Sequence, residues 1–350
     1  MGQLFNGVWQ PGAVASGDAS GRYIRPRPRF RDWVTRDGSH GPNGADAFPA
    51  EKGRYHLYVS FACPWSHQTL IYRMIKELED VVSVSILHPE MLEEGWSFAT
   101  DYADTTGDTL YGLPFLRDIY TKAQPDYTGH ATVPVLWDKE RETIVSNDSG
   151  DIIRMFNSAF DDITGNTLDF YPEEQRDPIE ELNSRIYSTL NNGVYRCGLA
   201  RSQDAYNEAV IDLSDTLEWL ETRLSSSRYL LGEHVTEADW RLAVTLFRFD
   251  LAYHTLFKCN RWYIRELPAL WGYARDLYQW TGVPETVNFE HIVRHYHLSY
   301  DNVHPFPIVP INPVLDWTDA DVVAQRSQVS KPARGRRRSR PNPAAARLSG

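Results

Sequence analysis

Apolar and polar residues alternate in two short stretches in the first half of the chain, and a helical pattern lies between them. Residues 54–61 ("RYHLYVSF") and 81–88 ("VVSVSILH") repeat with a period of two, which predicts strands. From Thr69 the apolar residues recur with a period of about 3.6, so Pro64 stands at or near the first turn of a helix. The pattern therefore predicts a βαβ unit with a right-handed crossover.

Two more strands and a helix complete this half of the chain. Residues 132–138 ("TVPVLWD") and 142–148 ("ETIVSND") have strand patterns, and residues 151–160 have a helical one. The order βαβ, insertion, ββα is the thioredoxin-like arrangement. The insertion, which contains "EEGWSF", departs from the minimal version of that fold.

After about residue 165 the strand patterns stop and only amphipathic helical patterns remain. We therefore expect a thioredoxin-like α/β domain followed by an all-α, all-helical domain. Within the second domain, Thr236 stands three residues before Asp239, which predicts a capping box worth about 1 kcal/mol. The predicted parts are an N-terminal extension (1–50), the thioredoxin-like domain (51–165), the helical domain (166–325) and a disordered basic tail (326–350).

Composition adds the compartment and the class of partner. The chain has 350 residues and three cysteines without a repeated spacing, so a disulfide framework is not expected. The first ten residues lack a signal-peptide pattern and no apolar run is long enough for a membrane span, which predicts a cytoplasmic protein that is not bound to membrane.

The net charge of −11 is unevenly distributed along the chain. Residues 326–350 carry eight basic residues and no acidic one, so the body of the protein is strongly acidic. An acidic body repels nucleic acid, and we expect no nucleic-acid partner. The tail either binds an anionic surface weakly or serves only as a solubilising extension.

The candidate chemistry starts at Cys63 in "FACPWSHQT". A cysteine at a helix N-terminus is exposed to the positive end of the helix dipole, so we expect the pKa of its thiol to fall. A dithiol oxidoreductase has a second cysteine three residues later, but this chain has Ser66. The second thiol must then be a small soluble one such as glutathione, although Cys-Pro also occurs in inert scaffolds of this fold.

Two further segments supply the contacts that a bound tripeptide needs. Pro134, preceded by a cis bond, would present the backbone of Val133 to an extended peptide, with an ordinary edge-strand proline as the alternative. Ser149 precedes a helix whose N–H groups could bind a carboxylate, with an ordinary helix cap as the alternative. We expect the other two thiols, Cys197 and Cys259, to be small buried hydrophobes.

Three histidines, His291, His295 and His297, raise the question of a metal site. The first two are four residues apart, but "HIVRH" has no glutamate in the position of the zinc-protease motif, and no carboxylate ligand follows closely. We expect no metal.

The chain resembles the glutathionyl-hydroquinone reductases, the Xi class of the glutathione transferase superfamily. The resemblance runs from residue 21 to residue 310 and rests on several specific blocks, among them "SFACPWSHQT", "EEGWSF", "TVPVLWDKERETIVSNDS", "NNGVYRCGLA", "TEADWRL", "FKCN" and "HIVRHYHLSY". It implies a homodimer that uses glutathione as co-substrate to reduce S-glutathionyl-hydroquinones to hydroquinones, with release of glutathione disulfide.

The resemblance also implies a role for individual residues. The catalytic nucleophile falls on Cys63. The glutathione contacts fall on Trp96, His130, Val133, Pro134, Asp148 and Ser149. The tyrosines that hold the hydroquinone ring and help to move protons fall on Tyr195, Tyr253 and Tyr296.

This chain departs from the family pattern at three of its positions. His130 stands where the family usually has arginine or lysine, Asp148 where it has glutamate, and Gln68 where it has arginine. Histidine loses its charge near neutral pH, so weaker or more pH-dependent glutathione binding is expected. Two other functions stay open: an omega-like monothiol transferase acting on dehydroascorbate or glutathionylated proteins, and a non-catalytic carrier of aromatic conjugates.

Overall fold

The four predicted strands of the first half form one mixed sheet. In the computed structural model, which describes residues 2–12 and 17–329, the strand order is β10-β9-β5-β6. Strand β5 is parallel to β6 and antiparallel to β9, which in turn pairs antiparallel with β10. The bounds are β5 Tyr55–Val59, β6 Ser83–Ile86, β9 Val135–Asp138 and β10 Thr143–Ser146.

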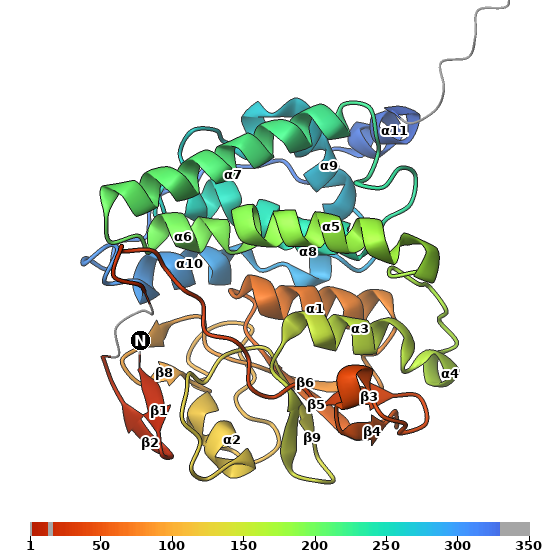
Figure 1. The fold of residues 1–350 in the computed structure, drawn as a ribbon, viewed down its shortest axis with the longest axis vertical. Helices are drawn as coiled ribbons and strands as arrows, with labels where there is room; N and C mark the ends of the chain where they lie inside the picture. The colour runs from red at the N-terminus through yellow and green to blue at the C-terminus, as the bar shows by residue number, and fades with distance from the viewer. Residues whose placement is uncertain (1, 13–16, 330–350) are drawn as a thin grey trace, which may run out of the picture.

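Helices cover both faces of this sheet because its strands are buried on both sides. Leu57 of β5 belongs to the core that α1 (Pro64–Ile75) and α3 (Ser149–Ser158) share with the helical half. Tyr58, the next residue, points the other way into a smaller core with α2 (Leu116–Ala123). The thioredoxin-like arrangement predicted for this half is confirmed. Figure 1 shows α1 and α3 between the sheet and the helices above it.

The insertion and the N-terminal extension add short strands around this sheet. Within the insertion, β7 (Met91–Leu92) pairs with β8 (Gly95–Trp96). In the extension, the N–H of Asp32 donates to the carbonyl of Val145 at 2.9 Å, which brings the extension to the edge strand β10. The strands of the extension are β1 (Gln3–Phe5), β2 (Val8–Gln10), β3 (Trp33–Thr35) and β4 (Ala47–Pro49).

The second half is helical, as predicted. Its helices stack above α1 and α3 in Figure 1, and one continuous apolar core runs through both halves. The longer helices are α5 (Arg176–Ile186), α7 (Gln203–Leu224), α8 (Glu237–Arg248), α9 (Pro268–Tyr278), α10 (Phe289–Ser299) and α11 (Ala320–Val329). The shorter ones are η2 (Glu173–Gln175), η3 (Tyr187–Asn191), α6 (Gly193–Gly198), η4 (Phe249–Tyr253), η5 (Ile264–Glu266) and η6 (Pro284–Thr286), of which η3 and η4 are π-helical turns. The first half has two further short helices, η1 (Pro42–Gly44) and α4 (Asp161–Thr164).

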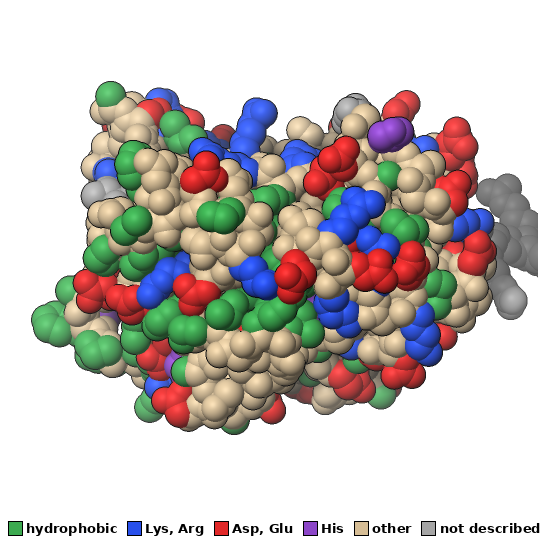
Figure 2. Space-filling view, turned by 90° about the horizontal axis from the view of Figure 1, so that it is seen from below, with side chains coloured by type: hydrophobic (Ala, Val, Ile, Leu, Met, Phe, Trp, Pro, Cys, Tyr) green, Lys and Arg blue, Asp and Glu red, His purple; other side chains and the backbone are tan. Residues whose placement is uncertain are grey.

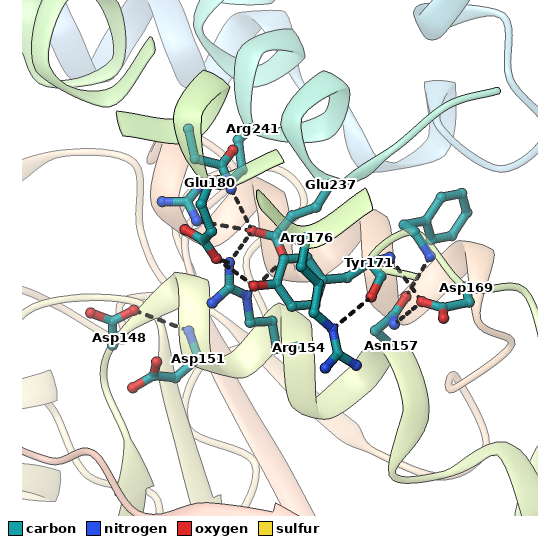
Figure 3. A network of polar contacts seen from close by, with 12 residues as sticks. Asp148, Asp151, Arg154, Asn157, Asp169, Tyr171, Arg176, Glu180, Glu237 and Arg241 are labelled. Atoms are coloured by element: carbon teal, nitrogen blue, oxygen red, sulfur yellow. Dashed lines mark hydrogen bonds and ion pairs between the residues drawn. The ribbon is translucent and has the colours of Figure 1, made fainter. Parts of the chain in front are cut away.

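A polar network fixes the two halves relative to each other. Arg154 of α3 binds both carboxylate oxygens of Glu237, the first residue of α8, at 2.9 Å. Glu237 is buried and also accepts hydrogen bonds from Arg241 at 3.1 Å and from Asn183 at 2.9 Å. Figure 3 shows Arg154 of α3, Glu180 of α5 and Glu237 of α8 converging from these three helices. A buried carboxylate with several charged partners is costly to break, so α3 is held firmly beneath α8.

The charges on the surface and the character of the helices are relevant to the prediction that the protein binds neither nucleic acid nor membrane. On the lower face of the molecule, Figure 2 shows acidic and basic side chains interspersed, without a wide field of one sign. In the part of the chain that the structure describes, none of the helices has the length and apolar character needed to cross a membrane.

The predicted disordered tail needs one correction. Residues 326–329 belong to α11, and Arg326 is buried, with its guanidinium donating to the carbonyl oxygens of Leu224, Ser227 and Arg228. A buried arginine with three carbonyl acceptors anchors a helix, which the composition of the segment did not indicate. The rest of the predicted tail, residues 330–350, lies outside the described residues.

Candidate active site

Cys63 lies where the sequence predicts it, between strand β5 and helix α1. It is the N-cap residue of α1, and Pro64 is the first residue of the helix. Cys63 is 8% exposed, and its Sγ lies 3.8 Å from the carbonyl oxygen of Val133. The peptide bond between Val133 and Pro134 is cis, as predicted. The thiol and the backbone that would hold a peptide therefore lie side by side.

The prediction that the pKa of the Cys63 thiol falls is wrong for this structure. Burial raises the pKa of the Cys63 thiol, because desolvation disfavours the thiolate. Four opposing influences lower the pKa: the backbone hydrogen bond from Ser66, the charge of Arg248, the backbone hydrogen bond from Trp65, and the hydrogen bond from the Ser66 side chain. The helix N-terminus thus favours the thiolate as expected, but burial has the larger effect.

Arg248, the last residue of α8, reaches from the helical half to the backbone just before Cys63. It is fully buried, and its guanidinium donates to the carbonyl oxygens of Phe61 and Ala62, both at 2.9 Å. Its Nη1 also donates to Nδ1 of His67 at 3.0 Å, so burial and this cation together hold the pKa of His67 well below its ordinary value. Arg248 therefore positions the Cys63 loop and supplies it with a positive charge.

Asp148 and Ser149 lie at the start of α3, which a carboxylate can approach. Asp148 is the N-cap residue, and its Oδ1 accepts a hydrogen bond from the backbone N–H of Asp151 at 3.0 Å. Both Asp148 and Ser149 are half-buried. Arg31, from the N-terminal extension, forms a bidentate ion pair with Asp151, with both contacts at 2.7 Å. A ligand with a positive and a negative group can bind here. The second carboxylate oxygen of Asp148 would accept from the positive group, and the N–H groups of the first helical turn would donate to the negative one.

Trp96 belongs to strand β8 of the insertion, and His130 lies five residues before strand β9. The Trp96 ring stacks on His295 of α10, with centroids 4.9 Å apart, which links the insertion to the helix that carries Tyr296. The Nδ1 of His130 lies 3.3 Å from the carbonyl oxygen of Gly2. Because a carbonyl oxygen can only accept, Nδ1 is the donor in this contact.

The three predicted tyrosines come together as a chain of phenol groups. The hydroxyl of Tyr296 lies 2.7 Å from that of Tyr195 and 2.8 Å from that of Tyr253. Burial raises the pKa of all three phenols, so they are neutral at neutral pH. Two hydrogen bonds use two of the three O–H protons, which leaves one proton for an oxygen atom of a ligand.

This phenol chain lies near the thiol. The charge of a Cys63 thiolate adds to the raised pKa of Tyr195 and of Tyr300, a residue whose ring stacks on Tyr296. Trp65, two residues after Cys63, bridges toward Tyr195 through the guanidinium of Arg25, which lies 4.9 Å from the Trp65 ring and 4.5 Å from the Tyr195 ring. The thiol and the phenols are thus close enough to interact electrostatically.

The remaining cysteines and histidines have structural surroundings. Cys197 and Cys259 are 2% and 0% exposed, which confirms that they are buried. His291, His295 and His297 each contact a backbone carbonyl oxygen, those of Ala103, Pro89 and Leu251. Among the described residues, no three histidine, cysteine or carboxylate side chains group together as metal ligands do.

Sequence reasoning did not single out Arg25, Trp65, Arg248 or Tyr300. Arg25 lies in the "YIRPRP" segment, where no period marks an element, and Arg248 follows an apolar helical pattern that gives no sign of its burial. Their roles come from contacts between residues far apart in the chain, which a local pattern does not contain. Gln68 is also unexpected: it is 1% exposed, and both polar atoms of its amide lack a hydrogen-bond partner among the described residues.

The fold and this arrangement of residues define a glutathione transferase. Two family models match, "Glutathione S-transferase, N-terminal domain" over residues 62–159 and "Glutathione S-transferase, C-terminal domain" over residues 203–276. The glutathionyl-hydroquinone reductase YqjG of Escherichia coli is 50% identical over 92% of this chain and 97% of its own length.

Two solved structures agree with that match. The glutathione-bound structure of YqjG superposes with a TM-score of 0.84 at 49% identity, covering 90% of this chain and 97% of the other. A Xi-class glutathione transferase from Natrialba magadii has a TM-score of 0.84 at 44% identity, covering 91% and 95%. This chain therefore belongs to the glutathionyl-hydroquinone reductase family, the Xi class of the glutathione transferases.

Proposed function

We propose that this protein reduces S-glutathionyl-hydroquinones to hydroquinones with glutathione as the co-substrate. The observation that carries the proposal is a lone thiol, Cys63, at a helix N-terminus beside three hydrogen-bonded phenols. A thiol without a resolving partner suits a reaction in which the second thiol is a substrate. A row of neutral phenols suits a substrate with ring oxygens.

In the first step, the Cys63 thiolate attacks the sulfur that links glutathione to the ring. A disulfide forms between Cys63 and glutathione, and the bond between sulfur and the ring carbon breaks. Before the attack, the ring tautomerises to a keto form, in which the carbon bonded to sulfur takes up the proton of a ring hydroxyl. When the bond to sulfur breaks, its electron pair passes through that carbon to the carbonyl oxygen, which then takes up a proton, so the aromatic part is reduced while the two sulfurs are oxidised. The free O–H of the phenol chain of Tyr195, Tyr253 and Tyr296 donates to a ring oxygen during this step.

In the second step, the thiolate of another glutathione attacks the mixed disulfide. Glutathione disulfide leaves, and the Cys63 thiolate is restored for the next cycle. Arg248 supports both steps because its charge favours the anionic sulfur against the effect of burial. The net reaction consumes one conjugate and one glutathione and yields one hydroquinone and one glutathione disulfide.

The residues around the thiol have proposed roles in holding glutathione. The backbone of Val133 before Pro134 binds the cysteinyl part of the tripeptide as an added strand. Asp148 binds its amino group, while Ser149 and the N–H groups of α3 bind the neighbouring carboxylate. Trp96 and His130 contact the remainder of the molecule. The support is their position: Val133 touches Cys63, and Asp148 and Ser149 begin the next helix.

Replacing Cys63 with alanine tests this proposal. The Cys63→Ala variant should fold normally and lose reductase activity, because the thiol supplies chemistry and little packing. Wild-type protein should reduce a glutathionyl-hydroquinone in preference to dehydroascorbate. Mass spectrometry of wild-type protein treated with the conjugate alone should place one glutathionyl group on Cys63. A glutathionyl group on Cys197 or Cys259 would contradict the assignment of the nucleophile.

We further propose a homodimer that works in the cytoplasm. The C-terminal segment carries exposed apolar side chains that an interface would cover, namely Phe306, Ile308, Ile311 and Val314. Three free thiols and a reaction that consumes reduced glutathione suit a reducing compartment. Light scattering coupled to gel filtration tests the dimer.

A further inference from the structure

Arg25 of the N-terminal extension places a positive charge in the site without a carboxylate partner. Its Nε donates to Oδ1 of Asn192 at 2.8 Å, and its guanidinium lies over the rings of Trp65 and Tyr195. Among the described residues, no aspartate or glutamate oxygen forms an ion pair with it. The cation is therefore fixed in place by neutral groups only.

These contacts do not explain the position of one atom of Arg25, the Nη2 nitrogen. It is buried, and no acceptor among the described residues accepts a hydrogen bond from it. A buried donor on a charged group costs free energy when it is unpaired, so each such atom in a folded protein calls for a reason. An anionic oxygen on a ligand beside Nη2 would supply that reason.

The neighbours of Arg25 indicate which ligand carries the oxygen. On one side lies Trp65, two residues after Cys63, and on the other lies Tyr195, the end of the phenol chain. The guanidinium thus lies between Trp65, which closely follows the nucleophile in the chain, and the phenols that would bind ring oxygens. When the ring departs with the electron pair, negative charge moves onto a ring oxygen.

We propose that Arg25 is a further catalytic residue, whose Nη2 donates to the hydroquinone oxygen that becomes negatively charged as the bond between sulfur and the ring breaks. This inference rests on the proposed function. The step is the first one described above, with no added reactant: the electron pair of that bond passes to the ring, Arg25 stabilises the resulting oxyanion, and a proton from the phenols or solvent completes the product. The extension thereby completes the active site.

The test compares two substrates of Cys63. Arg25→Met should lower kcat/KM for a glutathionyl-hydroquinone about 100-fold, the usual range for loss of an oxyanion donor. Reduction of 2-hydroxyethyl disulfide, which needs Cys63 and glutathione but contains no ring, should change less than about twofold. Arg27→Met, at an exposed position of the same extension, is the matched control and should leave both activities unchanged.

Three results would overturn the inference. Equal losses with both substrates would mean that Arg25 only maintains the structure. A weaker glutathione affinity of Arg25→Met, measured by calorimetry in a Cys63→Ala background, would mean that Arg25 binds a glutathione carboxylate. Unchanged reduction of the hydroquinone conjugate would mean that Nη2 has no part in the reaction. If the wild-type protein itself does not reduce the conjugate, the proposed function fails, which is a distinguishable outcome.

Discussion

Replacing Asp239 with alanine should cost this protein more stability than an ordinary helix cap does. Asp239 is 0% exposed, and its carboxylate accepts four hydrogen bonds. Two come from the N–H and hydroxyl of Thr236, at 2.8 and 2.9 Å, as a capping residue would receive. The other two come from the backbone N–H of Leu230 at 2.9 Å and the hydroxyl of Tyr273 at 2.8 Å.

The magnitude follows from what the substitution leaves behind. Alanine would leave the N–H groups of Leu230 and Thr236 and the Tyr273 hydroxyl without their acceptor, and an unpaired buried donor costs about 1 to 3 kcal/mol. Some of that cost is recovered when the site relaxes or admits water, so we expect a loss of about 3 to 5 kcal/mol. The capping pattern alone predicts about 1 to 2 kcal/mol.

Urea denaturation of the full chain measures the difference. With an m-value of about 3 kcal/mol per molar urea, the midpoint should fall by roughly 1 to 1.7 M. Tyr273→Phe is the matched control, since it removes one of the four hydrogen bonds and keeps the carboxylate; it should cost about 1 kcal/mol. The reasoning is refuted if Asp239→Ala shifts the midpoint no further than Tyr273→Phe does.

The remaining predictions concern the site. The charge of Arg248 lowers the pKa of Cys63 and so opposes the effect of burial. Arg248→Met should therefore shift the pH at which the rate of Cys63 alkylation rises to a higher value, and Arg248→Lys should shift it less. Identical pH profiles of the alkylation rate would contradict the role assigned to Arg248. In a Cys63→Ala background, His130→Arg should strengthen glutathione binding by about 1 kcal/mol, because a permanent guanidinium cation would then face a glutathione carboxylate. Equal affinities of the two proteins by calorimetry would place His130 outside the glutathione site.

The hydrophobic pattern predicted the thioredoxin-like half well because its strands and helices are local and strongly periodic. Pro64 begins α1 as predicted, and Cys63 is its N-cap residue. The pattern did not predict β3, which is three residues long, because its position depends on β4 and on β10 more than 100 residues later. Such pairings depend on the fold and leave no period in the sequence.

The residues of the candidate site also form two groups, those that local sequence features predicted and those that they did not. Cys63, Val133 and Pro134 followed from local features, namely a strand end, a helix start and a proline. Tyr195, Tyr253 and Tyr296 followed only from the resemblance to a family, because each is one aromatic residue among 19 tyrosines. The structure adds the reason for grouping them, since their hydroxyls form one hydrogen-bonded chain.

The roles of two arginines of the candidate site, Arg248 and Arg25, can be interpreted only from the contacts in the structure. The guanidinium of Arg248 has acceptors at Nε, Nη1 and Nη2 and contacts the backbone before the thiol, so its effect should extend to every reaction of Cys63. Arg25 has a buried Nη2 without an acceptor among the described residues, and its guanidinium lies over the ring of Tyr195, one of the three phenols. Substituting Arg248 should therefore change disulfide and hydroquinone reduction together, whereas substituting Arg25 should separate them. The same charge at two positions thus has two roles, one on the sulfur and one on the ring that leaves it.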